Sequence, residues 1–91
     1  GQHLAELDAL GPAKAATLSA WEAEVRGRFA LVRGQATSAR TIFSEQVERT
    51  RAAGLTEELF RAEVGLGRAF VAEKKPALAI APLGRALALL E

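Results

Sequence analysis

The side chains that catalysis and metal binding most often use are scarce in this chain. His3 is the only histidine and there is no cysteine, so neither a histidine base nor a metal cluster can be assembled. Gly65 and Gly67 fall within a helical pattern with no Gly-Lys-Ser/Thr after them, which favours packing glycines over a phosphate loop. The carboxylates that we expect at helix-surface positions near basic residues are Glu22, Glu24, Glu45, Glu48, Glu57 and Glu58. We therefore expect no catalytic residues, no metal, no cofactor and no enzymatic activity.

The charge balance and the hydropathy argue against two classes of partner. Twelve Lys and Arg residues against eleven Asp and Glu residues leave a net charge of +1, far from the basic excess of a nucleic-acid-binding protein. Charged residues interrupt every apolar stretch, so neither a transmembrane helix nor a membrane partner is predicted. No signal peptide is recognisable, and we expect a cytoplasmic location. The chain begins with Gly1 and contains no Met, which indicates a segment of a larger protein.

Composition and apolar spacing predict an all-α domain. Hydrophobic residues make up 49% of the chain but aromatic residues only 5%, so most apolar side chains are those of Ala and Leu, which favour helix. Leu4, Leu7 and Leu10 predict an N-terminal capping helix over residues 1–11. The next helix ends at Gly34 and starts at Pro12 or at Ser19. Its apolar stripe consists of Leu18, Trp21, Val25, Phe29 and Val32.

Three further helices complete the predicted domain of about five. The spacing predicts a third helix over residues 36–53, with Gly54 as its left-handed end. Thr56 offers a cap for a fourth helix, which runs to Ala72. A fifth helix covers residues 76–90, and Pro82 within it predicts a kink.

The chain repeats itself at an interval of 40 residues. This shift pairs Gly27 with Gly67, Arg28 with Arg68, Ala39 with Ala79, and Phe43 with Leu83. The equivalent residues sit where helices would pack closely, which predicts a first, diverged repeat over residues 12–54 and a second over residues 55–91. Within each copy the small residues are separated by the same distance, from Gly27 to Ala39 and from Gly67 to Ala79.

The second repeat resembles the tetratricopeptide family in Leu66-Gly67-x-x-Phe70, followed by Ala79-x-x-x-Leu83 and Ala86. The resemblance implies antiparallel helix-turn-helix repeats that form a right-handed superhelix. The first repeat departs from the pattern at Arg26, Ala30 and Gln46. Family repeats are about 34 residues long, and longer ones resemble the helical sensor regions of bacterial signalling and transcription-regulatory proteins. A plain Ala-rich helical bundle is the alternative.

The resemblance also implies a surface for protein partners, because the first helix of each repeat lines a concave groove. The groove residues that we expect to contact a peptide are Trp21, Arg28, Arg61 and Arg68. Arg28 and Arg68 are equivalent in the two repeats and suit an acidic peptide. The lysine and asparagine of the family's carboxylate clamp are absent, because these places hold Glu24 with Arg28 and Val64 with Arg68.

The fifth helix predicts a second surface. Its apolar residues spread around most of its circumference, so a single hairpin partner cannot cover them. The self-association surface that we expect consists of Leu83, Leu87 and Leu90. The sequence therefore predicts a protein-interaction module that binds a protein or peptide, forms a homodimer, or packs against further repeats. A purely structural oligomerisation or spacer segment without a ligand is the alternative.

Overall fold

The chain breaks into helices where glycine, lysine and proline interrupt the helical backbone. The computed structural model describes residues 11–91, apart from the side chains of residues 12 and 13, so His3 and most of the predicted capping helix lie outside the described part. Four α-helices follow one another: α2 (Pro12–Val32), α3 (Ala36–Ala53), α4 (Thr56–Ala72) and α5 (Pro76–Leu89). Residues 11–91 contain no strand. The described part of the chain is therefore all-α, with four helices rather than the five expected for the whole sequence.

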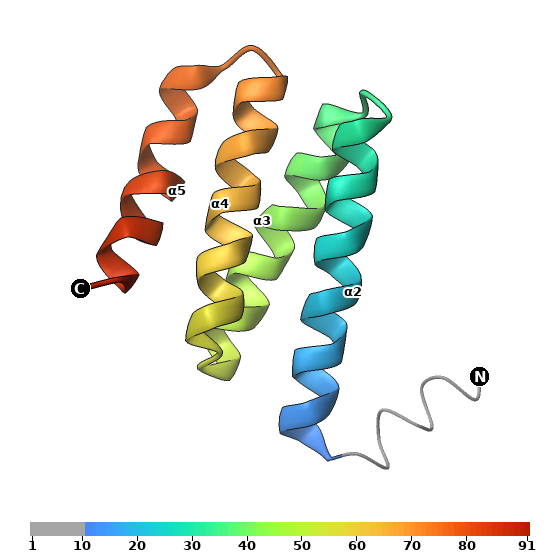
Figure 1. Cartoon of the computed structure of the whole chain (residues 1–91), viewed down its shortest axis with the longest axis vertical. Coiled ribbons are helices and arrows are strands. Elements are labelled where there is room, and N and C mark those ends of the chain that lie inside the picture. The colour runs from blue at the N-terminus through green and yellow to red at the C-terminus, as the bar shows by residue number, and fades with distance from the viewer. Residues whose placement is uncertain (1–10) are drawn as a thin grey trace.

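The four helices form one layered arrangement in which successive helices run in opposite directions (Figure 1). Helix α3 packs against α4, α4 packs against α5, and α2 contacts both α3 and α4. Helix α4 thus has neighbours on several sides, whereas α2 and α5 each leave a face uncovered. Over residues 11–91, none of the helices combines the length and apolar character that a bilayer crossing requires.

Most helix ends agree with the sequence. Helix α2 begins at Pro12, which decides between its two candidate starts, and the predicted bounds of α3 are confirmed. Gly34 and Gly54 have φ angles of 76° and 70°, a left-handed conformation that glycine adopts without a steric cost. The predicted Thr56 cap is wrong: Leu55 precedes the helix, and no side chain caps it. Helix α5 continues through Pro82, which is buried, and the kink stays a prediction.

The turn between α2 and α3 is repeated between α4 and α5. Gly34 in the first turn and Lys74 in the second, 40 residues apart in the sequence, have φ angles of 76° and 64°. The residue that follows each one donates its backbone N–H to a carbonyl five residues earlier, over 2.8 Å and 2.9 Å respectively. This bond satisfies a carbonyl at the end of the helix. The interval seen in the sequence is therefore present in the backbone.

The core lies where α2, α3 and α4 meet, and Phe43 of α3 is at its centre. Its ring is 2% exposed. A Cβ atom built on Gly27 of α2 or on Gly65 of α4 would come within 3.0 Å of this ring, so both helices approach it closely because they carry no side chain there. A Cβ on Gly67 would likewise come within 3.0 Å of Leu83 of α5. Gly67 thus approaches Leu83 most closely, where the sequence suggested Ala79.

These close approaches predict opposite effects for two Gly→Ala substitutions. Gly65→Ala should lower the free energy of unfolding by about 1 to 3 kcal/mol, because the new methyl group overlaps a ring that Gly27 confines as well. Gly84→Ala in α5 should raise it by about 0.5 to 1 kcal/mol, because a Cβ there meets no atom within 4 Å and alanine favours helix. Urea denaturation measures both values, and a stabilising Gly65→Ala would contradict this packing.

Candidate functional site

A groove lies between α2 and α4, with Phe43 of α3 at its base. Its volume is about 240 Å³. The residues that line it are Glu24, Arg28, Leu31, Phe43, Phe60, Arg61, Val64, Gly65 and Arg68. Three of the four predicted groove residues, Arg28, Arg61 and Arg68, are therefore brought to one cavity. The groove combines apolar walls with charged groups, a composition typical of ligand-binding sites.

The predicted groove residue Trp21 is placed differently. It does not belong to the lining residues, and it is 54% exposed. The guanidinium carbon of Arg61 lies 5.2 Å from the centre of the Trp21 ring, a cation–π contact. Trp21 therefore orients Arg61 from α2, although it lines no part of the cavity.

The arginines of the groove differ in how far they are neutralised. Arg28 lies 3.5 Å from Glu24 on its own helix. Arg61 lies 3.2 Å from Glu57 and 3.9 Å from Glu24. Arg68 is exposed and forms no ion pair with any described residue. Three arginines against Glu24 leave the lining with an excess of positive charge, and Arg68 carries the charge that is free to bind an anion.

The groove can recognise a carboxylate beside an apolar side chain. A guanidinium group donates two parallel hydrogen bonds to a carboxylate, which a lysine cannot do. Leu31, Phe60 and Val64 supply apolar walls next to these donors. An acidic residue followed or preceded by an aliphatic one fits this arrangement. Within residues 11–91, no group of three or more His, Asp or Glu side chains is placed to hold a metal ion.

The predicted self-association surface lies on the outer face of α5. Leu83, Leu87 and Leu90 are 38%, 64% and 68% exposed, and we call these three residues the α5 surface. Leu78 and Ile80 are exposed on the same helix. No described helix covers this face, since α5 packs against α4 alone. The expectation that one neighbour cannot cover α5 is thus confirmed for the described residues.

A second apolar surface lies where the sequence suggested a buried face. We call it the α2 stripe: Leu18, Trp21, Val25, Phe29 and Val32. These side chains are between 44% and 86% exposed. Small residues of α2 are buried in their place, namely Ala20, Gly27 and Ala30. Small residues permit the close approach of α2 to Phe43, so the large residues are turned outward. The sequence pattern showed an apolar stripe but not which neighbour it faces.

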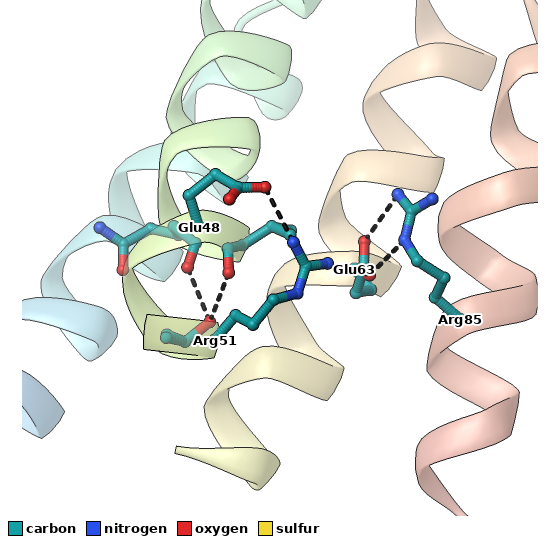
Figure 2. A network of polar contacts seen from close by, with 7 residues as sticks. Glu48, Arg51, Glu63 and Arg85 are labelled. Carbon is teal, nitrogen blue, oxygen red and sulfur yellow. Dashed lines mark hydrogen bonds and ion pairs between the residues drawn. The ribbon is translucent and has the colours of Figure 1, made fainter. Parts of the chain in front are cut away.

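A buried carboxylate was also missed. The side chain of Glu63 on α4 is 1% exposed and lies between arginines of two other helices (Figure 2). Arg85 of α5 donates from Nε to Oε2 over 2.6 Å and from Nη2 to Oε1 over 3.2 Å. Arg51 of α3 lies 3.6 Å from Oε2 and also bonds Glu48 at 2.9 Å. The hydrogen bond to Glu63 raises the pKa of Arg85 above its ordinary value.

One signal for this buried charge was available in the sequence. Glu63 stands four residues after Leu59 and three before Leu66, within the apolar face of α4. A second carboxylate, Glu73, is placed similarly at the end of α4. Its Oε1 lies 2.8 Å from Nε of Arg40, without hydrogen-bond geometry, and its Oε2 accepts a hydrogen bond from Thr37 over 3.1 Å. The expectation that carboxylates are confined to helix surfaces is wrong at these two residues.

The two repeats share their turn geometry and a close contact between a glycine and the following helix, Gly27 with Phe43 and Gly67 with Leu83. These equivalences are internal to the chain. Relationship to other proteins was sought separately, in sequence and in structure. Comparison with protein-family models, with curated proteins and with solved structures found no match to this chain.

Proposed function

We propose that this chain is a protein-interaction module without enzymatic activity that binds an acidic segment of a partner protein in the groove between α2 and α4. The observation that carries the proposal is the lining itself: Arg28, Arg61 and Arg68 converge on one cavity with apolar walls. We further propose that the module is a pair of tetratricopeptide-like repeats within a larger, cytoplasmic, bacterial regulatory or signalling protein. The 40-residue equivalence of turns and contacts supports a repeat.

The partner's chemistry follows from the groove's charges. Arg68 has no carboxylate neighbour among the described residues, so binding an acidic side chain there displaces no existing ion pair. Arg28 and Arg61 already contact Glu24, which keeps them extended toward the cavity. An acidic residue therefore meets a preorganised set of donors, which lowers the entropy lost on binding.

Selection from a library of short random peptides displayed on phage tests the proposal. Peptides that bind the wild-type chain should be enriched in Asp or Glu next to aliphatic residues. Their affinity should decrease as salt concentration rises, because the ion pairs are near the surface. Absence of any enriched acidic motif would contradict peptide binding and favour the alternative, a structural oligomerisation or spacer segment.

Arg68→Glu should weaken binding of a selected acidic peptide by about tenfold or more, since hydrogen bonds to charged groups contribute about 1.5 to 3 kcal/mol. Fluorescence anisotropy of the labelled peptide measures the change. Arg49→Glu is the matched control, because it makes the same change of charge at an exposed position of α3 outside the groove lining. If both variants weaken binding equally, general charge rather than the groove is responsible.

A further inference from the structure

We propose that a second copy of this chain seats its α2 stripe on the α5 surface, so that copies join end to end. The two surfaces lie on the first and the last helix of the described chain (Figure 1). They are exposed, apolar and without a neighbour among the described residues. This inference is independent of the groove, because its residues are those of the α2 stripe and the α5 surface.

The interior of the chain already contains one half of such a junction. A shift of 40 residues places Leu83 and Leu87 of α5 on Phe43 and Val47 of α3. Phe43 and Val47 are 2% and 3% exposed, because α4 covers them. The α5 surface is thus the equivalent of a face that a following helix covers in the first repeat.

The other half of the junction is equivalent in the same way. The shift places Val25 and Phe29 of the α2 stripe on Gly65 and Ala69 of α4. Gly65 is buried against Phe43, and Ala69 is 0% exposed. The face of α2 that is open to solvent is therefore equivalent to the face of α4 that packs against α3. Helix α2 of one copy fits α5 of another as α4 fits α3.

Side-chain sizes support this pairing. Within the chain, the largest residue of the contact, Phe43, meets the smallest, Gly65. At the junction between copies, both partners change together: the smaller Leu83 replaces the phenylalanine, and the larger Val25 replaces the glycine. A contact that exchanges volume between its two sides keeps its total nearly constant, which close packing requires.

Charge does not oppose the docking. Glu22 and Arg26 border the α2 stripe and form an ion pair of 2.7 Å with each other. The edge of the stripe therefore brings no net charge toward α5. Because the two docking faces differ, the contact is heterologous, and each added copy leaves a new α2 stripe and a new α5 surface at its ends. The association should have no fixed stoichiometry.

Two substitutions separate this arrangement from a symmetric dimer. Val25→Glu blocks the α2 stripe, and Leu87→Glu blocks the α5 surface; the two side chains are 65% and 64% exposed, so neither change alters the core. Sedimentation velocity should show wild-type chain whose mean mass rises with concentration into the millimolar range. Each variant alone should be a monomer. A mixture of the two should form a one-to-one heterodimer, because each supplies the face that the other lacks.

Other outcomes overturn the proposal. If Val25→Glu still dimerises and only Leu87→Glu is monomeric, two α5 surfaces pair with each other instead. If the reverse is seen, two α2 stripes pair. A wild-type chain that stays monomeric at millimolar concentration would show that the occupant is not a second copy, as when flanking repeats of a longer protein cover both faces. Far-UV circular dichroism of both variants establishes that they are folded.

Discussion

Replacing Phe43 with Ala is expected to lower the free energy of unfolding by about 3 to 5 kcal/mol. The ring is 2% exposed and contacts Gly27 of α2 and Gly65 of α4. Neither glycine has a side chain that can move into the vacated space, so a cavity remains and its lining loses van der Waals contacts. Because small domains have a total stability of about 5 to 15 kcal/mol, the loss should shift the urea midpoint strongly.

The matched control for this substitution is Leu83→Ala at the equivalent position of the second repeat. Leu83 is 38% exposed and contacts a glycine on one side only, Gly67. Its replacement should therefore cost about 1 kcal/mol in the monomer, where part of the side chain is already in water. Urea denaturation at low protein concentration measures both losses. Equal losses would show that the two repeats do not differ in this way.

The helix boundaries were predictable because they depend on local backbone preferences. Gly34 and Gly54 adopt left-handed conformations, and Pro12 and Pro76 stand at the first positions of their helices. Such residues act through φ and a missing N–H, which do not depend on distant neighbours. The buried face of α3 was also predictable, because its apolar periodicity is flanked by helices of the same chain.

The orientation of α2 was not predictable from its periodicity. A stripe of large apolar residues indicates contact with something apolar but does not say whether that neighbour belongs to the chain. In α2, alanines and Gly27 face the core, and the stripe with Val25 and Phe29 faces outward. The tight approach to Phe43 decides this, and only the packed arrangement of three helices reveals it.

The groove was partly predictable, because the 40-residue interval places Arg28 and Arg68 at equivalent positions on α2 and α4. Both line the cavity, together with Arg61. The contribution of Phe43 and Phe60 to the lining was not foreseen, since it depends on where α3 lies and on the tilt of α4. The burial of Glu63 likewise depends on arginines that reach it from α3 and α5.

Replacing Arg85 with Leu is expected to lower the free energy of unfolding by about 3 kcal/mol, near the lower end of values for breaking a buried ion pair. The substitution leaves the Glu63 carboxylate 1% exposed with only Arg51, at 3.6 Å, to compensate it. The loss stays near the lower end because Arg85 itself is half exposed and partly solvated. Replacing Arg26, whose pair with Glu22 is largely exposed, should cost less than about 1 kcal/mol and serves as the control.

The double substitution Glu63→Leu with Arg85→Leu separates the value of the pair from the cost of a stranded charge. Burying a charge is costly, and well-packed apolar residues often replace a buried pair without loss. The double variant should therefore be more stable than Arg85→Leu alone, although it lacks more of the native network. A double-mutant cycle from urea denaturation gives the coupling between the two residues. If both variants are equally destabilised, Glu63 contributes through packing rather than through its charge, and Arg85 is not its essential partner.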